Sequence, residues 1–347
     1  MIDPSEALAS DTIRDALQRL YAGDGLSRGE ANALFTALVE GRLNDAEIAS
    51  MLVALRLKGE TVDELVGAAQ ALRAADRPFE RPDYLFADCC GTGGDGSGSI
   101  NVSTAVAFVV AAAGLPIAKH GNRSISSRCG SADVLEQLGA KLDVEPEKSR
   151  RLLDEVGVCF LFAPLYHPGL KYAGPIRRAL KVRTIMNVLG PCLNPAEPPV
   201  QLLGVADPKL LEPVAEVLDE LGVKRALIVH GAGLDEIALH GETTAIFLKE
   251  DGAERMTISP ADAGLETAPI EALSGGDPGE NAQRLMTLFE GRGSTAERDV
   301  VALNAGALLM TAGVAADLKD GTAAAADALE SGAALARLHA FVEASHG

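Results

Sequence analysis

Gly91-Thr-Gly-Gly-Asp-Gly-Ser-Gly-Ser99, followed by Ile100-Asn-Val-Ser-Thr104, is the stretch that carries the clearest structural signal in this sequence. It lies between an apolar run at residues 84–90, typical of a buried strand, and a helical pattern that begins at Val102. Glycines let the backbone approach a ligand closely and turn its N–H groups toward an anion. The start of the helix adds further N–H donors. The stretch therefore predicts a phosphate-binding loop in an α/β protein.

Two common phosphate-binding motifs do not account for this loop. Gly91-x-Gly93-x-x-Gly96 has the glycine spacing of a dinucleotide fingerprint, which also needs an acidic residue about 20 positions later. No Asp or Glu occurs from Gly96 through Ala132, and the Gly-Lys-Ser/Thr ending of a P-loop is missing. A dinucleotide-dependent oxidoreductase stays open as an alternative, which binding of NADH would test.

The pattern around the loop predicts the fold class. Up to about residue 76 the sequence predicts helices only, with capping boxes at Ser27-x-x-Glu30 and Thr61-x-x-Glu64 and a variant at Asn44-x-x-Glu47. Strand-like runs then alternate with helical patterns; they lie at residues 84–90, 116–119, 158–162, 226–230 and 244–248. We expect an α/β fold, with a small N-terminal α-helical domain and a large α/β domain whose central, mostly parallel sheet is flanked by helices.

The expected domain boundaries follow from Pro78, which stops the helical pattern, and from a basic, helix-capable stretch near residues 174–189. We expect a small helical domain at residues 1–78, joined by helices from about residues 174–195. The large α/β domain then comprises residues 79–173 and 196–347.

Composition excludes several classes of protein. Of the 347 residues 47% are apolar, which rules out a disordered chain. The net charge of -18 argues against nucleic-acid binding, because such binding gains affinity from Lys and Arg that displace counterions. The five cysteines form no C-x-x-C pair, and the N-terminal residues resemble no signal peptide. We therefore expect a cytoplasmic protein with free thiols that does not enter a membrane.

Two windows without Asp or Glu concentrate positive charge in this acidic chain. Residues 96–132 contain Lys119, Arg123 and Arg128. Residues 156–196 contain a second set, which comprises Lys171, Arg177, Arg178, Lys181 and Arg183. Such focused charge attracts a small, highly charged anion.

A candidate metal site follows the strand predicted at residues 226–230. Asp235 and Glu236 come after this strand and after Gly231 and Gly233. Paired carboxylates past the end of a strand suit Mg²⁺, which prefers oxygen ligands and usually bridges to substrate phosphates.

Six segments follow one another along the chain: Gly91-Thr-Gly-Gly-Asp95, Asn101-Val-Ser-Thr104, Lys119-His-Gly-Asn-Arg123, Gly130-Ser-Ala-Asp-Val-Leu-Glu136, Arg183-Thr-Ile-Met-Asn187-x-x-Gly-Pro191 and Leu234-Asp-Glu236. In this order and spacing they resemble the anthranilate phosphoribosyltransferase family. The resemblance extends from about residue 25 to the C-terminus and includes Asn281-Ala and Leu303-Asn-Ala305.

The resemblance implies a set of site residues. Phosphoribosyl diphosphate would be held by Gly91, Gly94, Asp95, Ser99, Asn101, Val102, Ser103, Thr104, Lys119, His120, Gly121, Asn122, Arg123, Ser124, Ile125, Ser126, Ser127 and Ser131. Anthranilate would be held by Gly91, Asn122, Arg177, His120 and His167. The Mg²⁺ ligands would be Ser103, Asp235 and Glu236. The chain departs from the family at Ser99, Lys181, Met186 and Cys192-Leu193, which concern the shape of the acceptor channel and not the phosphate chemistry.

The resemblance also implies the activity. The chain would be a Mg²⁺-dependent pentosyltransferase that moves the phosphoribosyl group of phosphoribosyl diphosphate onto the amine of anthranilate, in tryptophan biosynthesis. An aromatic amine is already nucleophilic at neutral pH, so we expect catalysis by positioning, without a side-chain acid or base. The family is typically homodimeric. We expect the N-terminal helices to supply a dimer surface, since the apolar faces at residues 34–38 and 48–55 exceed what a small helical unit can bury alone.

Two further alternatives stay open beside the oxidoreductase. A pyrimidine nucleoside phosphorylase shares the superfamily fold, but its pattern is Lys-x-Ser-Gly-Arg where this chain has Lys119-His-Gly-Asn-Arg123. Phosphorolysis of thymidine would favour that enzyme. A non-catalytic nucleic-acid binder is the other alternative, and a gel shift at physiological salt would test it.

Overall fold

The computed structural model of the chain describes residues 4–124 and 128–347. Four helices come first: α1 (Pro4–Tyr21), α2 (Arg28–Val39), α3 (Asp45–Lys58) and α4 (Val62–Ala74). The capping boxes predicted at Ser27, Asn44 and Thr61 are confirmed, since each side chain accepts from the third helical N–H and the glutamate there bonds back. These local bonds explain why each helix begins where the sequence predicts it.

The basic stretch that follows residue 173 joins these helices in space. It forms α9 (Ala173–Leu180) and α10 (Ile185–Leu189), and both contact α3. Leu34, Leu38, Ile48 and Leu55 are fully buried, in one cluster with apolar residues of α10 and of α11 (Leu211–Glu220). Helices from later in the sequence therefore complete the core, so these faces are buried within one chain and do not form the dimer surface that we expected of them.

The remainder of the chain is built on one sheet of seven strands within the described residues. Its strands are β1 (Ala87–Gly91), β2 (Ile117–Gly121), β3 (Val158–Phe162), β4 (Val200–Gly204), β5 (Arg225–Gly231), β6 (Thr243–Lys249) and β7 (Gly252–Ile258). They lie in the order β3-β2-β1-β4-β5-β6-β7. The first five are parallel to one another, whereas β6 pairs antiparallel with both β5 and β7. The expected mostly parallel sheet is confirmed.

Two strands were not predicted from the sequence. β4 is a short apolar run directly after prolines, and such a run does not distinguish a buried strand from a buried helix. β7 is an edge strand whose side chains are mostly exposed, so it lacks the apolar alternation of a half-buried strand.

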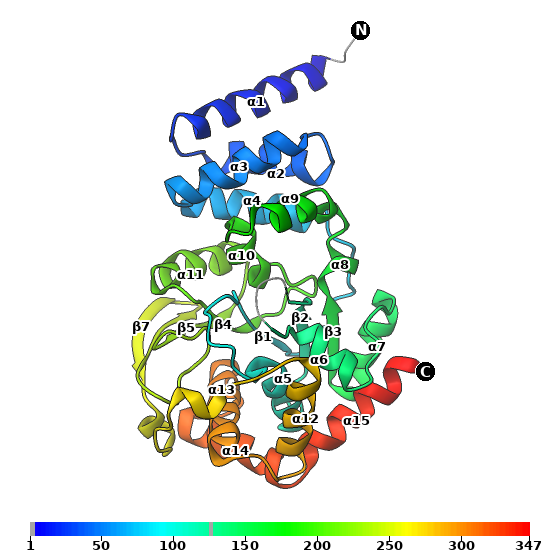
Figure 1. Cartoon of the computed structure of the whole chain (residues 1–347), viewed down its shortest axis with the longest axis vertical. Helices are drawn as coiled ribbons and strands as arrows, with labels where there is room; N and C mark the ends of the chain where they lie inside the picture. Colours follow the sequence, from blue (N-terminus) through cyan, green and yellow to red (C-terminus); the bar gives the residue numbers. More distant parts are fainter. Residues whose placement is uncertain (1–3, 125–127) are drawn as a thin grey trace.

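Helices cover both faces of the sheet. The other helices are α5 (Val102–Ala112), α6 (Ser131–Gln137), α7 (Pro146–Val156), α8 (Ala163–Tyr166), α12 (Pro278–Phe289), α13 (Thr295–Ala312), α14 (Leu318–Glu330) and α15 (Ala333–His346). In Figure 1 the first four helices lie at one end of the elongated molecule, the sheet lies in the middle, and α12–α15 lie at the opposite end.

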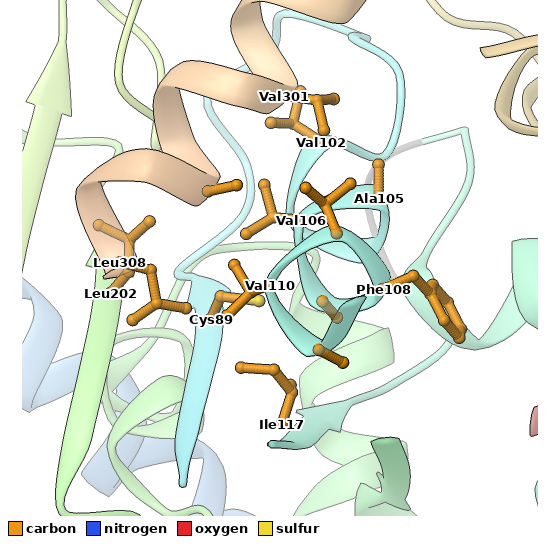
Figure 2. Close-up of a cluster of buried hydrophobic side chains, with 14 of the residues drawn as sticks. Cys89, Val102, Ala105, Val106, Phe108, Val110, Ile117, Leu202, Val301 and Leu308 are labelled. Atoms are coloured by element: carbon orange, nitrogen blue, oxygen red, sulfur yellow. The ribbon is translucent and has the colours of Figure 1, made fainter. Parts of the chain in front are cut away.

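Side chains alternate between the two faces of the sheet along each strand, and each face packs against helices to form a hydrophobic core. Leu202 of β4 faces α5 and α13, where it lies close to Cys89, Val110 and Leu308 (Figure 2). The next residue, Leu203, belongs instead to the cluster formed with the N-terminal helices. Because successive strand residues point to opposite faces, the central strands are apolar on both sides. No helix among the described residues has the length and apolar character needed to cross a membrane.

The strand order also fixes where a ligand can bind. The chain continues from β1 to β2 on one side, whereas β4 lies on the other side of β1. The connections therefore leave β1 in opposite directions, which opens a crevice at the carboxyl ends of these strands. The glycine loop follows β1 and lies at this end.

Candidate active site

Two adjoining cavities occupy this crevice. The first has a volume of about 300 Å³ and is lined by the glycine loop, the start of α5, the end of β2 and the Asp235–Glu236 loop. The second has a volume of about 200 Å³ and lies between the end of β2 and the segment that contains α8, α9 and α10. Gly91, His120, Asn122 and Asn187 line both, so the two cavities share a wall.

Most of the residues assigned by resemblance line these cavities. The first is lined by Gly91, Gly94, Asp95, Ser99, Asn101, Val102, Ser103, Lys119, His120, Gly121, Asn122, Arg123, Ser124, Ser131, Asp235 and Glu236. Arg177 and His167 line the second. Ile125, Ser126 and Ser127 lie outside the described residues. Thr104 is an exception, since it is fully buried and lines neither cavity, because its position on α5 turns it into the core.

The glycine loop is held from two sides. Gly93 donates its backbone N–H to Oδ2 of Asp235 at 2.6 Å. Nη1 of Arg183 donates to the carbonyl oxygens of Gly93 and Gly94, at 2.9 and 3.1 Å. Gly94 has a φ of 72°, which a side chain would strain. The metal-ligand candidate and one cation of the second acid-free window thus shape the same loop.

The Asp235 loop approaches β1 and β4 so closely that only glycine fits beneath it. A Cβ at Gly91 would lie 2.4 Å from Oδ2 of Asp235, and one at Gly204 would lie 1.6 Å from its carbonyl oxygen. Gly91 and Gly204 are paired across the two strands. Their lack of side chains therefore brings the carboxylates to the mouth of the first cavity.

The electrostatics of the carboxylates favour a cation. Burial and the nearby Asp95 raise the pKa of Asp235 to about 7. Burial and Asp235 raise the pKa of Glu236 to about 8, although Lys119 acts in the opposite direction. A positive charge between these groups would relieve their repulsion.

The residues fit magnesium as a substrate-bridging ion. In the part of the chain that is described, no three His, Cys, Asp or Glu side chains form a complete metal site. Mg²⁺, however, is usually bound through one or two carboxylates together with waters and substrate phosphates. The oxygen donors of Asp235, Glu236 and Ser103 provide such a partial site, and Glu236 accepts a hydrogen bond from the backbone of Ser103.

Lys119 places a buried cation beneath the glycine loop. Its Nζ lies 2.5 Å from the carbonyl oxygen of Cys89 and 3.3 Å from Oγ of Ser103. Burial alone would lower the pKa of Lys119, but the neighbouring Cys89 and Asp88 outweigh this effect and raise it above its ordinary value. Lys119 therefore stays charged at neutral pH.

The two other cations of the first acid-free window are less suited to bind a ligand, since one is engaged by a carboxylate and the other is exposed. Arg123 donates to Glu136 at 2.5 Å and lies over the ring of Phe162 at 4.6 Å. Arg128 is exposed at the rim of the first cavity. The loop amides and Lys119 therefore form the most enclosed cationic part of this cavity.

The second cavity has a cation of its own. Arg177 is half-buried, and Nη2 lies 3.4 Å from Oδ1 of Asn187. No carboxylate forms an ion pair with Arg177 among the described residues, and burial lowers its pKa. An arginine without a counter-ion beside a small cavity suits an acidic ligand.

Known proteins resemble this chain over most of its length. The glycosyl transferase family, a/b domain, matches residues 83–335, and the helical bundle domain of the same family matches residues 14–75. The anthranilate phosphoribosyltransferase of Sorangium cellulosum is 58% identical over 329 residues, which cover 95% of this chain and 94% of that protein. This chain belongs to the anthranilate phosphoribosyltransferase family.

Solved anthranilate phosphoribosyltransferases have the same fold. The enzyme from Thermus thermophilus aligns with a TM-score of 0.89 at 42% identity, over 96% of this chain and 100% of that one. The Saccharomyces cerevisiae enzyme, solved in complex with PRPP and Mg, aligns with a TM-score of 0.89 at 26% identity, over 97% and 98%. The same yeast enzyme was also solved with 4-fluoroanthranilate. The resemblance inferred from six short segments is thereby confirmed.

Some wall residues of this anthranilate phosphoribosyltransferase site were not assigned from the sequence. Asn281 of α12 is buried, donates to Oδ1 of Asn101 at 2.9 Å and accepts from the backbone of Gly276 at 2.7 Å. It fixes the start of α5 from a segment far along the chain. The only sequence signal for this role was that Asn281-Ala is one of the segments that resemble the family. Asn187 likewise appears in a family segment, without an assigned role.

Proposed function

We propose that the chain transfers the phosphoribosyl group of phosphoribosyl diphosphate to the amine of anthranilate. The products are N-(5-phosphoribosyl)anthranilate and diphosphate, in tryptophan biosynthesis. The observation that carries this proposal is the pair of adjoining cavities with a shared wall. One is suited to a diphosphate by its loop amides and Lys119, and the other to an aromatic acid by Arg177.

The donor would lie in the first cavity. The backbone N–H groups of the glycine loop and of the start of α5 are suited to phosphate oxygens. Lys119 adds a full positive charge from below. Asn101, held by Asn281, adds a fixed amide at the same position.

Magnesium would be held by Ser103, Asp235 and Glu236. When bound with the donor, it would neutralise the charge that develops on the departing diphosphate. The yeast relative solved with PRPP and Mg supports the choice of Mg²⁺ as the metal.

The chemical step would rely on position. The bond between ribose C1 and the diphosphate oxygen breaks, and its electron pair leaves with the diphosphate. Because the resulting centre at C1 resembles an oxocarbenium ion, it is open to attack by the amine lone pair. Arg177 would hold the carboxylate of the acceptor, so that the ring points its amine across the shared wall toward C1. After the new C1–N bond forms, the positively charged nitrogen loses its proton to water or to the released diphosphate.

The cysteines support a reducing compartment for this activity. All five are free thiols, and Cys89, Cys159 and Cys192 are buried. We propose that the enzyme acts in the cytoplasm.

We further propose that the enzyme is a homodimer. Exposed apolar side chains on the helical unit support this proposal, namely Leu57 at 80% and Tyr21 at 48% exposure. Light scattering at micromolar concentration should give twice the mass of one chain. A monomer under these conditions would contradict the proposal.

Loss of anthranilate fluorescence tests the activity directly. With the purified chain, phosphoribosyl diphosphate and Mg²⁺, the fluorescence should decay and diphosphate should appear in equal amount. Omission of the donor, or removal of the metal by EDTA, should abolish the decay, and added Mg²⁺ should restore it. Phosphorolysis of thymidine without any reaction of anthranilate would instead favour the nucleoside phosphorylase.

A further inference from the structure

A short segment just before α12, residues 272–276, lies along the second half of the glycine loop. We call this segment the strap. It pairs antiparallel with the loop through two backbone hydrogen bonds. The N–H of Ile100 donates to the carbonyl oxygen of Leu273 at 2.9 Å, and the N–H of Gly275 donates to that of Gly98 at 2.7 Å. The loop is thus held by residues about 175 positions later in the chain.

The strap fits closely against residues that we assign to the donor. A Cβ at Gly275 would lie 2.6 Å from the carbonyl oxygen of Ser99 and 2.8 Å from Oδ1 of Asn281. The same Oδ1 accepts the backbone N–H of Gly276 at 2.7 Å, and Asn281 donates to Asn101 at 2.9 Å. Gly276 and Asn281 line the first cavity. The end of the strap is therefore part of the wall of that cavity.

One side chain, Arg284 of α12, holds the strap from behind. Its Nη1 donates to the carbonyl oxygen of Ser274, and its Nη2 donates to that of Ala272 at 3.3 Å. Its Nε donates to Oε1 of Glu297 at 2.7 Å. Glu297 is buried and accepts from the backbone N–H and the hydroxyl of Ser294, at the start of α13. The guanidinium therefore ties the strap to a fixed helix start.

The chemistry of the guanidinium suits this place. It has N–H donors in a planar fork and no acceptor, and all three of its partners here are acceptors. The carbonyls that it binds belong to residues 272 and 274, whereas the groups that bond the loop belong to residues 273 and 275. Alternate residues of the strap thus face the loop and Arg284.

The glycine loop is a segment that needs such support. Four of its glycines have a positive φ, and a glycine-rich chain loses much conformational freedom when a ligand fixes it. Asp235 and Arg183 hold the first half of the loop. The strap holds the second half, at Gly98 and Ile100. A loop that already has its binding shape loses less freedom when the donor binds, so the donor binds more tightly.

We propose that Arg284 is a positioning residue for the phosphoribosyl diphosphate donor, which acts through the strap to hold the second half of the glycine loop in its ligand-binding shape. This inference rests on the function proposed above. Arg284 lines neither of the two cavities, so it acts on the donor through the backbone that it holds.

Hydrogen exchange in the ligand-free protein tests the contact itself. In Arg284→Ala, the amides of Ile100 and Gly275 should exchange about tenfold faster or more, while the amides of β4 keep their parental rates. Parental rates at Ile100 and Gly275 would overturn the proposal. This measurement by NMR needs no turnover. It stays informative even if the parent fails to react with anthranilate, a result that would refute only the proposed function.

Steady-state kinetics test the consequence for the donor. Arg284→Ala should raise the KM for phosphoribosyl diphosphate about tenfold or more, and the KM for anthranilate should stay within about twofold of the parent. The dissociation constant of phosphoribosyl diphosphate with Mg²⁺, measured by calorimetry, should rise by a similar factor. Equal changes in both KM values, or a parental KM for the donor, would contradict the proposal.

Arg284→Lys separates the planar fork from the charge. A lysine keeps the charge, but its single ammonium group cannot serve the three acceptors together. Its KM for the donor should therefore lie closer to that of Arg284→Ala than to that of the parent. A parental value would assign the effect to charge alone and overturn the proposal.

Gly275→Ala tests the strap without any change at Arg284. The added methyl group pushes the strap away from Ser99, so the KM for the donor should again rise while that for anthranilate does not. A parental KM for the donor would contradict the proposal. This variant also decides the matter if Arg284→Ala does not fold.

Two matched controls should equal the parent in both KM values and in amide exchange at Ile100 and Gly275. In Arg292→Ala the lost arginine is exposed, follows α12 and pairs with Glu290 instead of the strap. In Gly29→Ala the added methyl group meets open space on the exposed side of α2. A rise in the KM for the donor in Arg292→Ala equal to that in Arg284→Ala would overturn the proposal.

Discussion

The Asp235→Asn variant should lose about a hundredfold or more in kcat and still fold normally. The amide keeps the size of the side chain and can accept the N–H of Gly93, which lies 2.6 Å from Oδ2 in the parent. What it removes is the negative charge that would hold Mg²⁺ against the donor diphosphate. The loop should therefore keep its shape while the metal binds more weakly.

The folded state of Asp235→Asn should be at least as stable as that of the parent, although its activity falls. Because burial and Asp95 raise the pKa of Asp235 to about 7, the ionised carboxylate is less favourable in the folded chain than in the unfolded one. The neutral amide removes this cost. The melting temperature of Asp235→Asn, measured without Mg²⁺, should equal or exceed that of the parent.

The control for this prediction is Glu242→Gln. Glu242 is an exposed carboxylate just before β6, outside both cavities. Its variant should retain parental kcat over the full range of Mg²⁺ concentration. If Asp235→Asn matches the parent at saturating Mg²⁺, the metal role of this residue is wrong.

Arg177→Ala should raise the KM for anthranilate about 10- to 100-fold, the effect expected for a charged hydrogen bond of roughly 1.5–3 kcal/mol. The KM for phosphoribosyl diphosphate should change little. The reason is that Arg177 lines only the second cavity, whereas the donor contacts lie in the first. A half-buried guanidinium with no ion-pair partner in the described residues is suited to bind the carboxylate of the acceptor.

Arg178→Ala is the matched control. Arg178 is the next residue on α9, but it is exposed and lines neither cavity. We expect its variant to keep both KM values. Steady-state kinetics with each substrate varied in turn separates the outcomes. An equal rise in both KM values in Arg177→Ala would refute its role. A larger rise in the KM for anthranilate in Arg178→Ala would assign that role to Arg178.

Much of the donor side of the site could be predicted from the sequence, because it is local. The loop from Gly91 to Ser99 and the start of α5 are continuous in sequence, and glycine spacing followed by a helix start reports their shape directly. The capping boxes of the first helices are equally local. Even the Asp235–Glu236 pair was recognisable as a loop past a strand end.

Other parts depend on segments that are distant in sequence. Nothing near Asn281 indicates that its amide reaches Asn101, and nothing near Asp76 indicates a bond to His167. The same limit explains why the apolar faces at Leu34 and Ile48 were expected at a dimer surface, whereas they belong to a cluster that includes residues of α10 and α11. A sequence pattern shows that a face is apolar but not what packs against it.

The sequence by itself determined the first helices, the strands other than β4 and β7, the loop chemistry and the family, since these follow from propensity, capping and spacing among neighbouring residues. The tertiary structure alone decided that Gly91 and Gly204 stand side by side beneath Asp235. It also decided that Arg177 is left without a counter-ion among the described residues while Arg123 meets Glu136. Such pairings arise because burial of the apolar faces of the sheet fixes strand order and register. The polar groups at the strand ends are carried into place by that packing.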